Sequence, residues 1–109
     1  MKPFNYHSAK DSKEASKLSS SNSAFLAGGM TTIPSMKLGL ASYKDIIDIK
    51  GIKKLSGIKV SGKSVIIGAT TKHVEVANSK DVKKAIPSLA LLAEGIGDPQ
   101  VRNRGTIGG

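Results

Sequence analysis

Two glycine pairs flanked by threonines constrain this chain more than any other feature. The first pair is Gly28-Gly29, and the second is Gly108-Gly109, which follows Thr106 closely. Glycine leaves the backbone without a side chain, so the N–H groups of such loops can approach a ligand closely. Consecutive N–H groups beside hydroxyl groups suit a phosphate. The two loops are therefore candidates for contact with a phosphate.

The residues around the first pair predict a strand, then the glycine loop, then the start of a helix. Ala24–Ala27 are apolar and predict a short buried strand. Thr31 or Thr32 can cap the helix, and Pro34 suits its first position. This order directs backbone donors and the positive end of a helix dipole to one place.

On composition alone a structural turn is favoured for Gly28-Gly29, and a phosphate-binding loop is the alternative. The chain has no GxGxxG motif after its first strand and no GxxxxGK[ST] motif. The hydroxyls of Thr31, Thr32 and Thr106 are available to donate to a phosphate. Arg102 and Arg104 can add positive potential there, although a surface or salt-bridge role is favoured for both.

Alternating and apolar segments elsewhere predict further short strands. They are expected at 2–7, 43–49, 58–60 and 64–67. The last two form a hairpin, in which Ile58 and Val60 face inward. Asp45 and Asp48 flank isoleucines, so they are expected at the exposed ends of their strand.

Capping residues and apolar spacing predict several short helices. Their starts are expected at or just after Asp11, Thr71, Ser79 and Pro87. The last of these helices is predicted to end at Gly95 or Gly97. Its buried stripe is predicted to consist of Leu89, Leu92, Ala93 and Ile96. Residues 98–109 are polar and are predicted to be irregular.

The composition excludes several classes of functional site. The chain has no cysteine, so it holds no disulfide, thiolate metal site or cysteine-ligated iron–sulfur cluster. His7 and His73 lack a metal-ligand spacing and are predicted to be solvent-facing or locally bonded. No nucleophile–base arrangement stands out, so we predict no catalytic residue and no metal ligand. Any redox chemistry would belong to a bound cofactor.

The formal net charge of +9 makes nucleic-acid binding an alternative function. The lysines are scattered from Lys2 to Lys84 without interleaved aromatic residues, which favours a solvated lysine-rich surface. A basic patch facing an acidic partner is a third interpretation. No signal peptide and no stretch of about 18 apolar residues is visible. We therefore expect a cytoplasmic protein that spans no membrane and binds no nucleic acid.

Longer segments around both loops resemble a known family. Residues 25–38 resemble the first flavin-pyrophosphate loop of the FAD-binding medium subunits of aerobic molybdenum hydroxylases, and residues 96–109 resemble the second. This family includes the medium chain of carbon monoxide dehydrogenase and the FAD domain of xanthine dehydrogenase. Residues 2–6 and 67–73 also match its pattern, so the resemblance spans essentially the whole chain.

The resemblance implies an α+β fold, namely the N-terminal part of a PCMH-type, or vanillyl-alcohol-oxidase-like, FAD-binding domain. A first subdomain is expected at about 1–52 and the start of a second at about 53–109. The FAD pyrophosphate would lie between the two loops. Family members often carry His or Gln where Met30 stands, so Met30 is expected to contribute its backbone N–H. The implied FAD-binding residues are Leu26, Ala27, Gly28, Gly29, Met30, Thr31, Thr32, Ile33, Ile96, Thr106, Ile107, Gly108 and Gly109.

The resemblance also implies partner subunits. In that family a large subunit oxidises the substrate at a molybdenum cofactor, and electrons pass through [2Fe–2S] clusters of a small subunit to FAD and then to an external acceptor. Family members continue well beyond the second loop, so the chain is expected to be a fragment or a truncated product. By itself it is expected to bind FAD weakly or not at all. The alternative is a non-catalytic interaction module without FAD.

Overall fold

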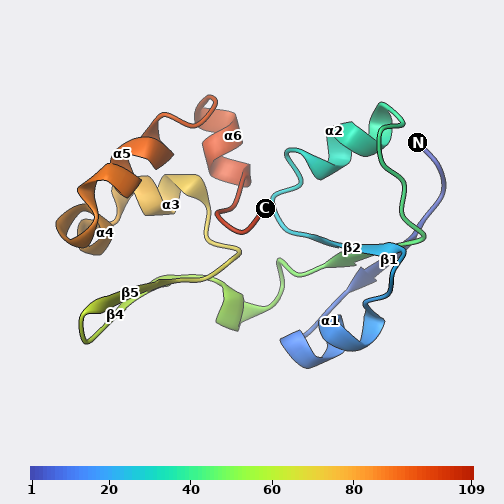
Figure 1. Ribbon diagram of the computed structural model, residues 1–109, viewed down its shortest axis with the longest axis horizontal. Coiled ribbons are helices and arrows are strands. Elements are labelled where there is room, and N and C mark those ends of the chain that lie inside the picture. Colours follow the sequence, from blue (N-terminus) through green and yellow to red (C-terminus); the bar gives the residue numbers. More distant parts are fainter.

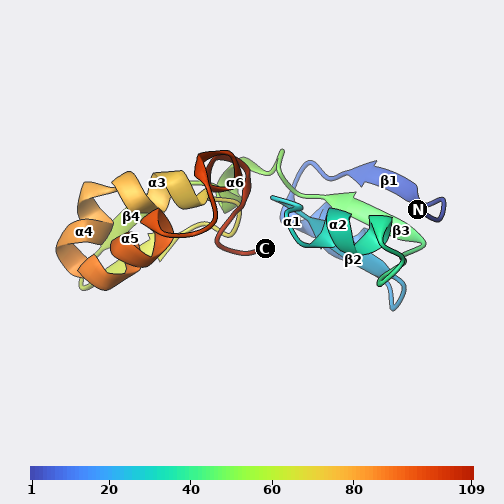
Figure 2. The ribbon, with the colours of Figure 1, turned by 90° about the horizontal axis from the view of Figure 1, so that it is seen from above.

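The computed structural model describes residues 1–109 and has two parts that lie side by side along its long axis (Figures 1 and 2). The first part holds a three-stranded sheet, and the second holds a two-stranded sheet with four helices. This mixture of strands and helices confirms the predicted α+β class.

The sheet of the first part is parallel and has the strand order β1-β3-β2. One helix follows β1 and another follows β2, as parallel strands require a crossover. The carboxyl ends of the strands therefore share one edge, and the first glycine loop leaves from it. The elements are β1 (Asn5–Ser8), α1 (Ser12–Leu18), β2 (Ser23–Leu26), α2 (Thr32–Lys37) and β3 (Asp45–Asp48).

Two adjacent isoleucines of β3 supply the centres of two small cores. Successive residues of a strand point to opposite faces of the sheet, so Ile46 and Ile47 serve different faces. Ile47 packs with Ala9, Ala15 and Ile52. Ile46 packs with Leu26 and Met36.

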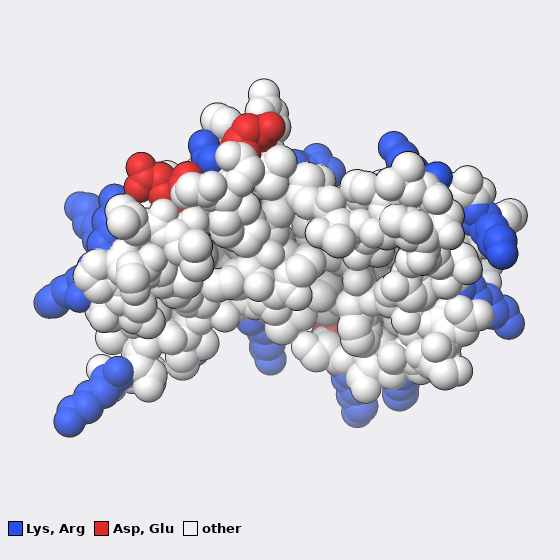
Figure 3. Space-filling view, turned by 45° about the horizontal axis from the view of Figure 1, so that its top comes forward, with Lys and Arg blue, Asp and Glu red and all other residues white.

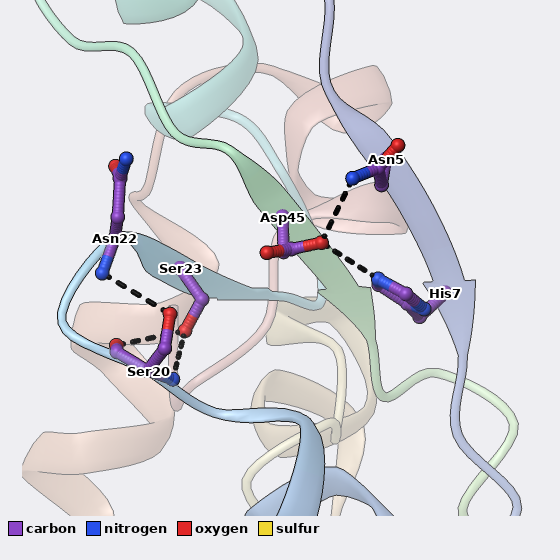
Figure 4. A network of polar contacts seen from close by, with 6 residues as sticks. All are labelled: Asn5, His7, Ser20, Asn22, Ser23 and Asp45. Carbon is purple, nitrogen blue, oxygen red and sulfur yellow. Dashed lines mark hydrogen bonds and ion pairs between the residues drawn. The ribbon is translucent and has the colours of Figure 1, made fainter.

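Asp45 is half-buried and joins β3 to β1 through its side chain (Figure 4). One of its carboxylate oxygens lies 2.9 Å from His7 Nε2 and accepts a hydrogen bond from the Asn5 amide at 3.3 Å. The hydrogen bond with His7, aided by that from Asn5, holds the pKa of Asp45 below its ordinary value. His7 is thus bonded to the neighbouring strand.

Asp48 is buried at the end of β3, so the prediction that it is exposed is wrong. Its carboxylate accepts hydrogen bonds from the Tyr6 hydroxyl and from the Lys50 N–H, the latter at 2.9 Å. The Lys50 ammonium lies 3.2 Å away. Burial alone would raise the pKa of Asp48, but these contacts outweigh it and hold the pKa below its ordinary value. Hydrogen bonds from β1 and from the turn after β3 thus offset the cost of burying the carboxylate.

We expect Asp48→Asn to lower the free energy of unfolding at pH 7 by about 2 kcal/mol, as for a lost hydrogen bond to a charged group. A pKa depressed in the folded state stabilises the fold above the unfolded-state pKa of about 3.9, and this contribution disappears as the pH falls through the folded-state pKa. Urea unfolding at pH 7 and at steps from about pH 5 to pH 2 measures it. The variant should lose less stability on acidification than the wild type.

The control is Asp81→Asn, because Asp81 is exposed and makes no side-chain hydrogen bond or ion pair. If the stability of Asp48→Asn depended on pH as that of the wild type does, the prediction would be contradicted.

The second part packs its helices against one hairpin. Its core holds Val76, Val82, Ala90 and Ala93, against which the hairpin residues Ile58, Val65 and Ile67 pack. No helix is both long and apolar enough to cross a membrane. The elements are the 3-10 helix η1 (Lys53–Leu55), β4 (Ile58–Ser61), β5 (Ser64–Ile67), α3 (His73–Asn78), α4 (Lys80–Ala85), α5 (Pro87–Glu94) and α6 (Pro99–Arg104).

Three of the predicted helix starts are confirmed, and that of α3 is not capped as predicted. Asp11 caps α1, Ser79 caps α4, and Pro87 begins α5, as predicted. Thr71 does not cap α3, because its hydroxyl donates to the carbonyl oxygen of Gly57 at 3.1 Å. The cap position belongs instead to Lys72, without a side-chain hydrogen bond.

Two predictions of buried apolar residues are wrong. Val60 is 55% exposed near the tip of the hairpin. In α5 the buried face consists of Ala90 and Ala93, whereas Leu92 is 66% exposed. Small alanine side chains allow α5 to lie close to the neighbouring helices, so the helix turns its alanines inward.

The prediction that residues 98–109 are irregular is wrong for their first half. Pro99–Arg104 form α6, in which Asp98 caps the helix by accepting the N–H of Val101 at 2.9 Å. Asp followed by Pro is a start signal for a helix, so the sequence contained this information. The helix delivers the chain to the second glycine loop.

Candidate functional site

The two glycine loops meet between the two parts of the fold. The Gly28 N–H donates to the carbonyl oxygen of Gly109 at 3.1 Å. Figure 1 shows the C-terminal end beside the loop that leaves β2. A cavity of about 160 Å³ is lined by Gly28, Gly29, Met30, Thr31, Thr32, His73, Gly105, Thr106 and Gly109. Residues distant in the sequence therefore form one small site.

The first loop turns sharply into α2. Gly29 has a φ of +74°, a left-handed conformation that side chains disfavour. Thr31 occupies the cap position of α2, but its hydroxyl makes no capping hydrogen bond. Pro34 is the third residue of the helix, whereas the sequence predicted the first. The turn thus depends on Gly29 and not on a side-chain cap.

Three consecutive N–H groups of the first loop have no acceptor within the chain. They belong to Gly29, Met30 and Thr31, all of which line the cavity. The hydroxyls of Thr31 and Thr32 likewise make no hydrogen bond within the chain. Backbone N–H groups need a partner, whether solvent or ligand. A group of donors at one place suits an anion with several oxygens, such as a diphosphate.

The second loop is held by strand-like pairing with the segment before α3. Residues 105–108 run antiparallel to residues 69–73, with Lys72 opposite Thr106. The anchors of this loop therefore come from residues earlier in the chain. The hydrogen bonds run from the N–H of His73 to the carbonyl oxygen of Gly105 (3.0 Å), from Ile107 to Thr71 (2.9 Å) and from Gly108 to Ala69 (2.8 Å).

Thr106 uses its hydroxyl within the second loop. The side chain is buried, and the hydroxyl donates to the carbonyl oxygen of Gly109 at 2.8 Å. The expectation that this hydroxyl donates to a phosphate is therefore not met in this arrangement. Its backbone N–H has no acceptor within the chain.

Gly28 and Gly108 are required by contacts of the chain with itself. A Cβ at Gly28 would lie 2.8 Å from the carbonyl oxygen of Arg104 and 2.9 Å from the Thr106 nitrogen. A Cβ at Gly108 would lie 2.7 Å from the carbonyl oxygen of Ala69. From the sequence, both glycines are expected to let a ligand approach the backbone. In the structure their missing side chains allow backbone segments to touch, which closes the site.

Six predicted site residues do not line the 160 Å³ cavity. Leu26 and Ile33 pack in the core around Met36. Ile96 lies in the turn after α5, so the structure does not bring its side chain to the cavity. The other three are Ala27, Ile107 and Gly108, of which Ala27 lines a separate cavity of about 420 Å³. Ile107 is 38% exposed.

The two arginines near the second loop have different environments. Arg102 donates through Nη1 to the carbonyl oxygens of Ile96 (3.0 Å) and Gly97 (3.1 Å). It therefore holds the turn between α5 and α6 and forms no salt bridge. Arg104 lines the 420 Å³ cavity together with Lys50 and Lys72.

Sequence reasoning missed His73 and Gly105, which both line the site. The spacing of the two histidines excludes a metal site, but it gives no information on whether His73 pairs with the distant second loop. The match of residues 67–73 to the family pattern was the one available signal.

The basic side chains do not form one continuous field on the face shown in Figure 3. Lysine and arginine side chains are spread around the outline, and acidic groups gather along one edge. Only two ion pairs form, His7–Asp45 and Lys50–Asp48. This distribution is the one expected of a solvated lysine-rich surface.

The fold of the chain is similar to that of chains in solved structures of carbon monoxide dehydrogenase. It matches a chain of carbon monoxide dehydrogenase from Hydrogenophaga pseudoflava that lacks the Mo-pyranopterin moiety of its cofactor, with a TM-score of 0.93 and 45% identity. The match covers 97% of this chain and 38% of that chain. The family described as "FAD binding domain in molybdopterin dehydrogenase" matches residues 2–109. The chain belongs to this family, which confirms the resemblance drawn from its sequence.

Two curated relatives show how far the similarity extends. The chain is 45% identical over 109 residues to the carbon monoxide dehydrogenase medium chain of Hydrogenophaga pseudoflava. It is 39% identical over 108 residues to the glyceraldehyde dehydrogenase medium chain of Sulfolobus acidocaldarius. Each match covers 97% of this chain, and the chain spans 38% of the length of each relative.

Proposed function

We propose that the chain is an FAD-binding component of a molybdenum-containing hydroxylase or dehydrogenase. Its family and its relatives support an oxidoreductase subunit. The observation that carries the proposal is the hydrogen bond between Gly28 and Gly109, because it brings the unpaired N–H groups of the first loop next to the second loop. We assign FAD binding to residues 26–33 and 106–109, of which Gly28–Thr32, Thr106 and Gly109 line the cavity and would face the diphosphate, and Ile96 stays a prediction.

The structure fits the cofactor at the diphosphate. The N–H groups of Gly29, Met30 and Thr31 are donors without acceptors in the chain. No aspartate or glutamate side chain lines the cavity. The chain's own residues would bind and orient the cofactor through its phosphates.

The partners in this proposal are a large subunit with the molybdenum cofactor and a small subunit with [2Fe–2S] clusters. When bound, FAD would supply the redox chemistry that takes electrons from those centres to an external acceptor. The relatives are named medium chains, which supports an assembly of several subunits. The cytoplasm stays the predicted compartment.

The proposal includes a boundary near residue 52 between two subdomains. The two sheets share no strand, and each part has its own buried apolar clusters. The alternative, an interaction module without FAD, is not favoured, because both loops are formed and face one cavity.

Titration of FAD into the ¹⁵N-labelled chain tests the proposal by amide chemical shifts. We expect the amide signals of Gly29, Met30 and Thr31 to move, while that of Gly62 at the distant hairpin turn stays in place. Riboflavin, which lacks the diphosphate, should leave all of them unchanged. Amide shifts also detect weak binding, which is what is expected of the chain by itself. Shifts confined to other residues, or none at saturating FAD, would reject the proposal.

A further inference from the structure

We propose that the His73 imidazole is a further FAD-binding group, which donates a hydrogen bond to the diphosphate. This inference rests on the proposed function. His73 is the first residue of α3 and lines the same cavity as both glycine loops. It would add a side-chain donor to a site otherwise made of backbone N–H groups and threonine hydroxyls.

Two observations place His73 against the second loop. The backbone N–H of His73 donates to the carbonyl oxygen of Gly105 at 3.0 Å. A Cβ at Gly105 would lie 2.9 Å from Cδ2 and 3.2 Å from Nε2 of the imidazole. The edge of the ring therefore occupies the space that a side chain at position 105 would need. Gly105 has no positive φ, and the same Cβ would lie 3.1 Å from the carbonyl oxygen of Val101, so the ring and this oxygen together require glycine there.

The imidazole has no hydrogen-bond partner within the chain. His7, by contrast, contacts the Asp45 carboxylate at 2.9 Å. His73 is half-buried, and no acidic residue lines its cavity. A neutral imidazole always carries one ring N–H, and a protonated one carries two. The ring thus offers a donor in the place where the N–H groups of the first loop also lack acceptors.

A diphosphate fits these donors better than either ring system of FAD. Hydrogen bonds to a charged oxygen are shorter and stronger than those between neutral groups. Aromatic stacking of His73 on a flavin or adenine ring would need an open ring face and would not require the neighbouring N–H groups. A hydrogen bond to the diphosphate and stacking on a ring of FAD can be told apart, because they strengthen the binding of different ligands.

Two substitutions separate hydrogen bonding from packing. His73→Phe keeps a ring against Gly105 but removes the N–H, and His73→Gln keeps an N–H donor on a side chain of similar reach. We expect His73→Phe to weaken the binding of FAD and of ADP by about 10-fold, since about 1.4 kcal/mol corresponds to this factor. His73→Gln should weaken both by less than about 3-fold, the smaller loss expected when a donor remains. Amide-shift titrations measure each affinity.

The ring nitrogens of the wild type provide a readout that packing alone would not move. We expect the ¹⁵N signals of the His73 ring to shift with FAD and ADP and to stay unchanged with riboflavin. If the amides of the first loop shift but the ring signals do not, this inference fails while the proposed function stands. If His73→Phe binds FAD and ADP as tightly as the wild type, the inference also fails. If no amide of the first loop shifts in the wild type, the proposed function itself is rejected, and the inference about His73 with it.

Discussion

Gly28→Ala is expected to abolish detectable FAD binding by this chain. The added Cβ would lie 2.8 Å from the carbonyl oxygen of Arg104 and from the Cα of Gly105. These atoms belong to the backbone, so no flexible side chain can move aside. The two loops must separate, and the hydrogen bond from residue 28 to Gly109 would break with them. The donors of the first loop would then no longer face the second loop.

The experiment compares amide-shift titrations of the wild type and of Gly28→Ala with FAD. Gly51→Ala is the matched control, because its Cβ would have one neighbour, the carbonyl oxygen of Ala9 at 3.9 Å, and its φ is not positive. This control should bind FAD with an unchanged affinity. Wild-type affinity in Gly28→Ala would show that binding does not need close contact between the loops.

The sequence predicted those features that depend on a few neighbouring residues. The caps at Asp11 and Ser79 and the start at Pro87 are local signals, since a side chain there bonds within its own turn or a ring fixes its own φ. The hairpin at 58–67 was predicted on the same basis. The family resemblance extended this to the fold class and to the two loops of the site.

Features that depend on distant contacts could not be predicted in this way. Asp48 is buried because a tyrosine from another strand reaches it, and nothing near residue 48 reports that contact. Gly28 and Gly108 look like sites of ligand approach in the sequence, but the structure shows that they accommodate the chain's own backbone. His73 enters the site only because residues 69–73 pair with the second loop. In each case the tertiary fold decides the role of the residue.

Gly68→Ala is expected to cause the largest loss of stability of any single glycine substitution in the chain. Its Cβ would lie 2.2 Å from the carbonyl oxygen and 2.5 Å from the carbonyl carbon of Leu55, the shortest such approaches at any glycine here. That same oxygen accepts hydrogen bonds from the N–H and the hydroxyl of Thr70, both at 2.8 Å. Relief of the clash must therefore move η1 away from the end of β5 and stretch these bonds.

We expect this substitution to lower the free energy of unfolding by about 3 kcal/mol, the upper end of the usual cost of overpacking. Urea unfolding measures the change. Gly95→Ala is the control, because its nearest neighbour would be the carbonyl oxygen of Leu92 at an ordinary 3.6 Å, so its stability should stay within about 0.5 kcal/mol. The segment after Gly68 continues into residues 69–73, which anchor the second loop, so Gly68→Ala should also weaken FAD binding. A variant as stable as Gly95→Ala would mean that η1 and β5 are not held together as the structure shows.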